Sequence, residues 1–110
     1  MRIEDLSPNL SNRVQFRLSE ALRVPDSSGC YALTNIYDEV IYIGQSLNLN
    51  QRMQQHLDTS RMTKTTSVGL AVWFYFGLLP PEKIKGIELQ LIFNYKAVEG
   101  NLPPLNRRGP

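Results

Sequence analysis

The sequence is poor in cysteine and histidine, with one residue of each, Cys30 and His56. A single cysteine excludes an internal disulfide, and it excludes a zinc site built from several cysteines. No apolar run reaches the roughly 20 residues that a membrane-spanning helix needs. At the N-terminus, acids and a proline stand where a signal peptide would have its apolar stretch. These absences favour an intracellular protein without a membrane partner.

The sequence also lacks a strong excess of charge of one sign. Its 12 Lys and Arg residues stand against 10 Asp and Glu residues, for a net charge of +2. This balance permits contact with nucleic acid but does not indicate it. With 110 residues, 42% of them hydrophobic, the chain is typical of one globular domain with an ordinary core.

Hydrophobic periodicity and turn residues predict an α+β fold. We expect, in order, a helix in residues 11–22, two strands of a hairpin in 30–36 and 39–44, a helix after Asn48, a strand in 68–76 and a helix over about 82–96. A hairpin and one further strand make a small, mainly antiparallel, three-stranded sheet. Helices should flank it.

The predicted hairpin carries two tyrosines, Tyr31 in "GCY" and Tyr42 in "YIG". If the loop between the strands has an even number of residues, both tyrosines lie on one face of the sheet. The opposite, buried face would then be filled by Cys30, Ala32, Ile41 and Ile43. Packing alone explains tyrosines in strands, because aromatic residues favour strands. The alternative is that both phenols face a ligand.

The helix after the hairpin carries Asn48, Arg52 and His56 at successive intervals of four residues. This spacing predicts a polar stripe on one face of the helix, which a solvated surface would also explain. Because the helix follows the second hairpin strand directly, its first turns should lie near the end of the hairpin. An arginine and a histidine beside two phenols are suited to a phosphate, since guanidinium donors match phosphate oxygens.

The last predicted helix carries a single carboxylate, Glu88, within an apolar stripe, four residues from both Ile84 and Ile92. A carboxylate on a buried face is costly unless it is paired or holds a cation. One interpretation is a structural pair with Arg52. The other is one loosely held Mg²⁺, which prefers oxygen ligands and keeps several waters.

Together these residues resemble the GIY-YIG nuclease family. The first motif stands as "GCY" (29–31), with Cys30 in place of the usual apolar residue, and the second is intact as "YIG" (42–44). The run "QSLNLNQRMQQHL" (45–57), Glu88 in "ELQLI" and Asn106 in "PPLN" are similar to later motifs of the family. The resemblance covers roughly residues 24–107. Two departures are Gln45, where some members carry Lys, and a longer stretch before Asn106.

The resemblance implies a metal-dependent endonuclease that hydrolyses DNA phosphodiester bonds, one strand per active site. Mg²⁺ or Mn²⁺ would be the cofactor, held by Glu88. Tyr31 would act as general base through a solvent-facing hydroxyl, and Tyr42 would bind phosphate or share that role. Arg52 would stabilise the phosphate, and His56 would contact a tyrosine or the phosphate, or move the proton.

The same resemblance implies further contacts and a domain division. The predicted substrate-binding residues are Gln45, Ser46, Asn48, Asn106 and Arg107. Residues 1–23 would be an N-terminal extension with a helix, and 24–110 the catalytic domain. Double-strand cleavage would need a partner chain or self-association. The basic candidates for phosphate contacts are Arg13, Arg17, Arg52, Arg61, Lys64, Arg107 and Arg108.

Two alternatives stay open at the level of the sequence. The first is a nucleic-acid-binding module that has the same fold and no catalytic activity. The second is a small interaction protein in which Glu88 serves only as a buried partner of Arg52.

Overall fold

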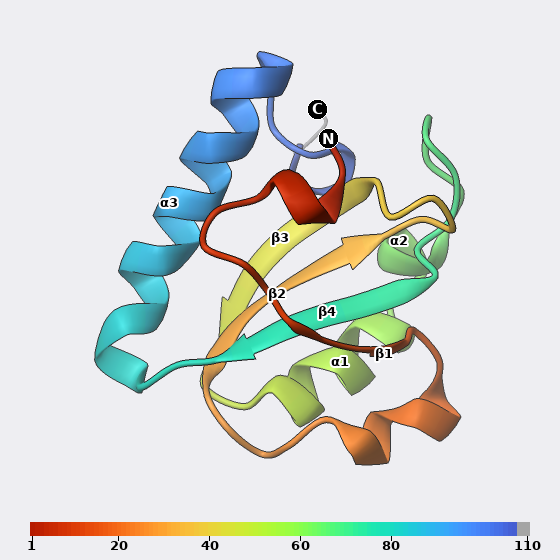
Figure 1. Cartoon of the computed structure of the whole chain (residues 1–110). Coiled ribbons are helices and arrows are strands. Elements are labelled where there is room, and N and C mark those ends of the chain that lie inside the picture. The colour runs from red at the N-terminus through yellow and green to blue at the C-terminus, as the bar shows by residue number, and fades with distance from the viewer. Residues whose placement is uncertain (108–110) are drawn as a thin grey trace.

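The computed structural model describes residues 1–107, so Arg108 lies outside the described residues. Its sheet has four strands, β1 (Asn12–Gln15), β2 (Gly29–Thr34), β3 (Val40–Ser46) and β4 (Trp73–Leu78). The strand order is β1-β4-β2-β3 and each neighbouring pair is antiparallel (Figure 1). This arrangement confirms the predicted antiparallel sheet flanked by helices. The sheet has one strand more than the three that we predicted.

The additional strand comes from the segment that we predicted to be an N-terminal helix. That prediction is wrong, because the segment forms β1 and then a 3-10 helix, η2 (Leu18–Arg23). Val14 and Phe16 are buried at alternate positions, as in a strand, whereas Leu18 and Leu22 are exposed. The helical spacing of the apolar residues therefore did not reflect a buried face. β1 pairs with β4, so this segment completes the sheet, and the division at residue 23 stays a prediction.

Helices cover both faces of the sheet (Figure 1). On one face lie α1 (Leu49–Leu57), α2 (Ser60–Thr63) and η2. On the other lie α3 (Pro81–Glu99) and the N-terminal segment with η1 (Ile3–Asp5). Near the C-terminal end of the described residues, a short 3-10 helix, η3 (Pro104–Asn106), lies beside β3. No helix within residues 1–107 is long and apolar enough to cross a membrane.

Local signals explain where the two long helices begin and end. The Asn48 side chain caps α1 by accepting a hydrogen bond from the Gln51 backbone N–H, as its position before the apolar stripe predicted. In α3, Pro81 occupies the first turn, where its missing N–H has no helical partner to lose. Gly100 ends α3 in the left-handed conformation, with φ of 78°.

Both faces of the hairpin are buried, which differs from the expected distribution of its side chains. Cys30, Ala32 and Ile43 pack under α3, as predicted. Ile41 packs instead on the α1 face, because the register between β2 and β3 shifts after Leu33. A bulge of this kind adds one residue to a strand and moves the following side chains to the other face.

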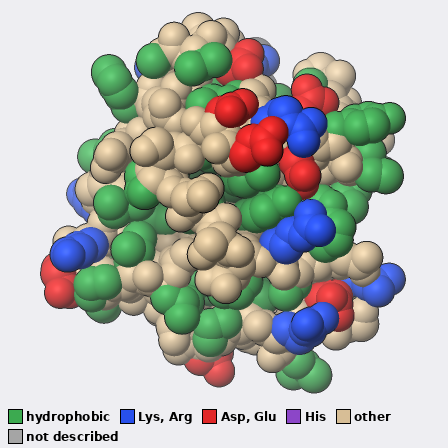
Figure 2. Space-filling view, in the orientation of Figure 1, with side chains coloured by type: hydrophobic (Ala, Val, Ile, Leu, Met, Phe, Trp, Pro, Cys, Tyr) green, Lys and Arg blue, Asp and Glu red, His purple; other side chains and the backbone are tan. Residues whose placement is uncertain are grey.

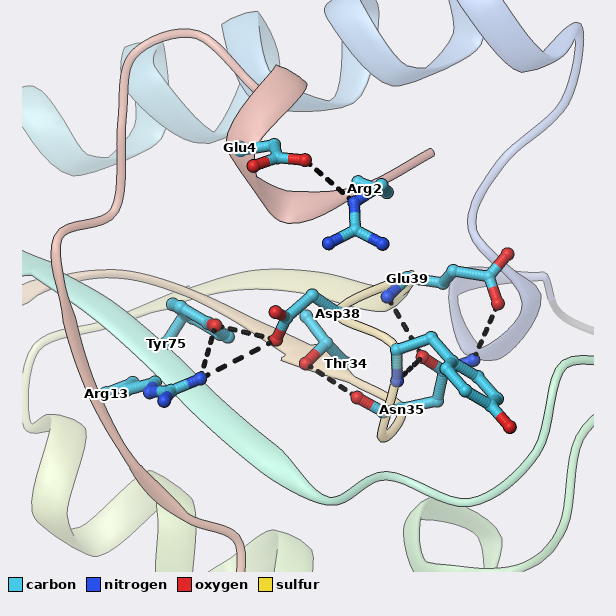
Figure 3. Close-up of polar contacts among 9 residues, drawn as sticks. Arg2, Glu4, Arg13, Thr34, Asn35, Asp38, Glu39 and Tyr75 are labelled. Carbon is cyan, nitrogen blue, oxygen red and sulfur yellow. Dashed lines mark hydrogen bonds and ion pairs between the residues drawn. The ribbon is translucent and has the colours of Figure 1, made fainter.

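The tip of the hairpin is fixed by side-chain hydrogen bonds (Figure 3) and by the N-terminal segment, where the Ile3 N–H donates to the Asp38 carbonyl oxygen at 2.8 Å. The Asn35 side-chain oxygen accepts hydrogen bonds from the backbone N–H groups of Tyr37 and Glu39. Asp38, with φ of 63°, accepts a hydrogen bond from the Tyr75 hydroxyl at 2.7 Å. These contacts hold the far end of the hairpin and leave its other end, near Ser46, to carry α1.

Candidate active site

Three rings from three different elements meet on the α1 face of the sheet, at its β3 edge. Tyr31 of β2 lies 6.0 Å from Tyr42 of β3 and 5.5 Å from His56 of α1, between ring centroids. Tyr42 and His56 are 5.4 Å apart. In the register, Tyr42 opposes Leu33, which is two residues from Tyr31, so both tyrosines lie on one face. The predicted shared face is therefore confirmed.

The glycines of the two motifs allow this close packing. Gly44 opposes Tyr31 across the β2–β3 pair, and a Cβ at Gly44 would lie 2.6 Å from the Tyr31 hydroxyl oxygen. A Cβ at Gly29 would lie 2.1 Å from the carbonyl oxygen of Gly77 on β4. Any side chain at either position would displace the backbone or the phenol. The glycines are thus required by close approach, and neither needs an unusual backbone angle.

Tyr31 is fully buried, with 0% of its surface exposed. The prediction that its hydroxyl faces solvent is therefore wrong. Its hydroxyl lies 2.5 Å from Nε2 of His56. Burial raises the pKa of the phenol well above its usual range, and the neighbouring Tyr42 adds to this, while Arg52 opposes it. The hydroxyl therefore stays protonated, and it donates to His56 in the tautomer that has no proton on Nε2.

His56 is also buried, although its spacing predicted a place on a polar stripe. Only 9% of its surface is exposed, and burial lowers its pKa to about 4. The positive charges of Arg52 and Arg61 lower the pKa further. The imidazole is uncharged at neutral pH, and this state leaves Nε2 able to accept the hydrogen bond from Tyr31.

Glu88 lies on α3, which covers the other face of the sheet, and its carboxyl is within electrostatic reach of Arg52 on α1. It is half-buried, and burial raises the pKa of its carboxyl, while the charge of Arg52 lowers it. Within residues 1–107, no ion pair joins Glu88 to Arg52, so the two groups interact only at longer range. The structural pairing considered from the sequence is therefore not a direct contact.

The donor set around Glu88 fits one loosely held divalent cation. Within the described part of the chain, no three His, Cys, Asp or Glu side chains gather to form a closed metal site. A single half-buried carboxylate without a direct cationic partner can supply one or two oxygen ligands. Mg²⁺ accepts such a site, because water and substrate phosphate supply its other ligands.

Three of the predicted substrate-binding residues use their polar groups within the protein. Asn106 accepts a hydrogen bond from the Ile43 N–H at 2.9 Å and donates one to its carbonyl oxygen at 2.8 Å. It thereby occupies the open edge of β3, beside Tyr42. Ser46 bonds the backbone of Asn48 through its hydroxyl, and Asn48 caps α1. All three hold the backbone of the site in place.

The other two predicted substrate-binding residues lie nearer the surface. Gln45 is half-buried on β3 opposite Cys30. Arg107 is exposed and donates from Nε to the carbonyl oxygen of Leu102 at 2.8 Å.

Arg61 on α2 belongs to the surroundings of the site, although sequence analysis named it only as one of several scattered cations. Its charge acts on His56, and its guanidinium donates to the carbonyl oxygens of Leu105 and Arg107. It thus holds the segment that carries Asn106. No local pattern indicates this role, because its partners are more than 40 residues away in the chain.

Comparisons with known proteins agree with this geometry. The model of the GIY-YIG catalytic domain family matches residues 27–101, more than half of the chain. The UvrABC system protein C of Limosilactobacillus reuteri is 36% identical over 45 residues, which cover 41% of this chain and 8% of that protein. The corresponding protein of Pediococcus pentosaceus is 33% identical over 45 residues, with the same coverage. The chain matches about 8% of the length of these curated relatives.

A solved structure shows the same fold. It is the GIY-YIG N-terminal endonuclease domain of UvrC from Thermotoga maritima, a point mutant bound to its catalytic divalent cation. The TM-score is 0.55 at 20% sequence identity, and the match covers 82% of this chain and 93% of that one.

Proposed function

The chain belongs to the GIY-YIG catalytic domain family, and on that premise we propose that it is a divalent-metal-dependent endonuclease acting on DNA. Each active site hydrolyses a phosphodiester bond in one strand. The observation that carries the proposal is the buried hydrogen bond between Tyr31 and His56, at 2.5 Å, beside the half-buried Tyr42. The Tyr31–His56 pair packs against the ring of Tyr42 and so fixes its position, and the charge of Arg52 acts on both members of the pair.

The division of labour between the two tyrosines follows from their burial. A general base must touch the water that it activates, and Tyr42 is the phenol with access to solvent. We therefore assign the general base to Tyr42, in place of Tyr31 as the sequence had indicated. Tyr31 and His56 then act as positioning residues. Their hydrogen bond fixes the two rings against which Tyr42 packs.

Arg52 and Glu88 supply the charges that the reaction needs. Arg52, half-buried on α1, donates to the oxygens of the scissile phosphate and stabilises the negative charge that develops on them. Glu88 holds the divalent cation. When bound, Mg²⁺ or Mn²⁺ polarises the phosphate and stabilises the leaving oxygen. Burial raises the pKa of the Glu88 carboxyl, and the positive charge of Arg52 opposes this and favours the ionised form that a cation needs.

The remaining predicted site residues divide into two groups. Gln45 and Arg107 lie near the surface and are proposed to contact the DNA backbone. Ser46, Asn48 and Asn106 hold β3 and the start of α1 in position for Tyr42 and Arg52. Residues 24–110 form the catalytic unit in this proposal, and residues 1–23 extend it by completing the sheet.

A plasmid assay tests the proposal. Supercoiled DNA is incubated with the protein in Mg²⁺, in Mn²⁺ and in EDTA, and nicked and linear products are separated. We expect nicked product with either metal and none with EDTA. Binding without cleavage in every condition would favour the inactive binding module and would contradict the proposal.

A further inference from the structure

A basic pocket lies on the surface between α2, the loop that follows it and the C-terminal segment. It has a volume of about 250 Å³. Arg61, Lys64 and Arg107 line it, together with the hydroxyl side chains of residues 65–67 and the edge of η3. A single water needs only about 10–15 Å³, so the pocket has room for a phosphate group with water around it.

The three cations of the pocket have no acidic partner among the described residues. On the face shown in Figure 2, acidic and basic side chains lie together, as in the Arg2–Glu4 pair at 2.7 Å and the Arg13–Asp38 pair at 3.8 Å (Figure 3). None of the residues that line the pocket is Asp or Glu. Among residues 1–107, no ion pair involves any of its cations. Three like charges in one pocket repel one another, so an anion there is stabilising.

The pocket adjoins the candidate active site. The Arg61 guanidinium donates hydrogen bonds to the carbonyl oxygens of Leu105 and Arg107, and its positive charge also lowers the pKa of His56. Leu105 and Arg107 flank Asn106 in the chain. The Asn106 side chain is hydrogen-bonded to the backbone N–H and carbonyl groups of Ile43, the residue after Tyr42. The segment around η3 therefore has the pocket on one side and the phenol site on the other.

We infer that the pocket binds a second phosphate of the DNA strand, next along the backbone to the phosphate that is cleaved. This inference rests on the proposed function, because it assumes that DNA occupies the site beside it. A guanidinium fork, a flexible ammonium and hydroxyl donors are the groups that commonly hold backbone phosphates. Such a contact carries no sequence information. It fixes which phosphate of the strand reaches Tyr42.

Lys64 offers the cleanest test of the pocket. Arg61 and Arg107 also donate hydrogen bonds to backbone carbonyl groups, so replacing them would disturb the C-terminal segment. Lys64 is exposed, and its side chain makes no hydrogen bond or ion pair with the rest of residues 1–107. Lys64→Gln therefore removes a charge and preserves the fold. Lys83→Gln, at an exposed position of α3 outside the pocket, removes the same charge and serves as the control.

Binding is measured in EDTA with a short fluorescent duplex at several salt concentrations. Each phosphate contact contributes about −0.9 to the slope of log affinity against log salt. We expect Lys64→Gln to make the slope shallower by about that amount, and Lys83→Gln to leave it unchanged. Equal slopes for the two variants would overturn the inference.

A chemical change in the DNA locates the contact. Duplexes with one neutral methylphosphonate beside the cleavage position should bind the wild-type protein more weakly at one flanking position. Lys64→Gln should bind the duplex modified at that position as tightly as it binds the unmodified duplex. If the methylphosphonate weakens both proteins equally, Lys64 does not contact that phosphate and the inference fails.

A free terminal phosphate has the same chemistry as a backbone phosphate. The inference assigns the pocket to a backbone phosphate, which every duplex contains. Duplexes that end in a 5′-phosphate or a 5′-hydroxyl should therefore bind equally well, and a preference for the 5′-phosphate would contradict the backbone assignment. Cleavage by the wild-type protein separates this inference from the proposed function. If DNA is cut but Lys64→Gln matches Lys83→Gln, only the pocket assignment fails. If no DNA is cut but the slopes differ, only the proposed function fails.

Discussion

At the residue scale, the two tyrosines of the motifs have different surroundings, and this difference determines what each can do. Tyr31 is closed off from solvent and hydrogen-bonded to His56, whereas Tyr42 is half-buried at the edge of the sheet. A protonated phenol against a neutral imidazole is a stable structural pair. The same pair packs against Tyr42, and in the proposed function it positions Tyr42 for the incoming phosphate.

Replacing each tyrosine by phenylalanine separates these roles. Tyr31→Phe removes a buried hydrogen bond and leaves Nε2 of His56 unsatisfied, so the free energy of unfolding should fall by about 1–3 kcal/mol. Tyr42→Phe should change it by less than about 0.5 kcal/mol. The cleavage rate of Tyr42→Phe should fall by about 10²–10⁴-fold, as expected for a general base. Urea denaturation and nicking rates measure both quantities. A Tyr42→Phe protein that cuts within about threefold of wild type would exclude Tyr42 as the base.

His56 is the single histidine, so its titration can be followed directly by NMR. Its pKa should be about 4, against roughly 6.5 for a free imidazole, because burial disfavours the charged form. Between these values the unfolded chain binds more protons than the folded one. The protein therefore loses stability as the pH falls from about 6.5 towards about 4, and keeps it above that window.

The same titration has an internal check. Arg52→Gln removes one of the charges that disfavour the imidazolium, so it should raise the pKa of His56. A wild-type pKa near 6.5 would show that His56 is exposed. An unchanged pKa in Arg52→Gln would show that Arg52 is distant from His56.

At the scale of elements, the sequence predicted the segments with strong local signals. The hairpin, the Asn48 cap of α1 and the apolar stripe of α3 all appear, because periodicity and capping act over a few residues. β1 was missed because four residues give too short an alternation, and its pairing with β4 spans about 60 residues of chain. The placement of Ile41 failed because a bulge in the hairpin leaves no clear mark in the sequence.

The candidate site likewise has features that the sequence predicted and features that it could not predict. The sequence predicted that the two tyrosines share a face if the hairpin loop is even, and the family resemblance grouped Arg52, His56 and Glu88 with them. It could not show that His56 is buried, that Asn106 clasps the backbone of β3, or that Arg61 holds the C-terminal segment. These features depend on contacts between elements far apart in the chain.

Gly44 links the sheet to the site, and an alanine there tests the link. The new Cβ would lie 2.6 Å from both Cζ and the hydroxyl oxygen of Tyr31, so the phenol or the strand must move. Gly44→Ala should lower the free energy of unfolding by about 1–3 kcal/mol, as in other overpacked cores. Gly44→Ala should also lower the cleavage rate, because it displaces the Tyr31–His56 pair.

Gly86→Ala is the matched control. No atom lies within 4 Å of a Cβ at this helical position, so the substitution should stabilise the protein by about 0.5–1 kcal/mol. Thermal denaturation of both variants gives the comparison. If Gly44→Ala is as stable and as active as Gly86→Ala, the close packing of Tyr31 on Gly44 does not constrain the site.

At the scale of the whole molecule, the described residues present one candidate active site. A single site can cut a single strand at each encounter, so a closed circular plasmid should pass through a nicked form before it becomes linear. The nicked form should accumulate in time courses at low protein concentration. Linear product that appears without a nicked intermediate would indicate that two copies act together on the DNA.

The central claim is that Glu88 holds the metal of a nuclease site, and one comparison tests it most directly. Glu88→Gln keeps the shape of the side chain and removes its charge, while Glu82→Gln does the same at an exposed position of the same helix. Plasmid nicking in Mg²⁺ and DNA binding in EDTA are measured for both variants. The account predicts that Glu88→Gln binds DNA and does not cut it, and that Glu82→Gln does both. Cleavage by Glu88→Gln at the wild-type rate would contradict it.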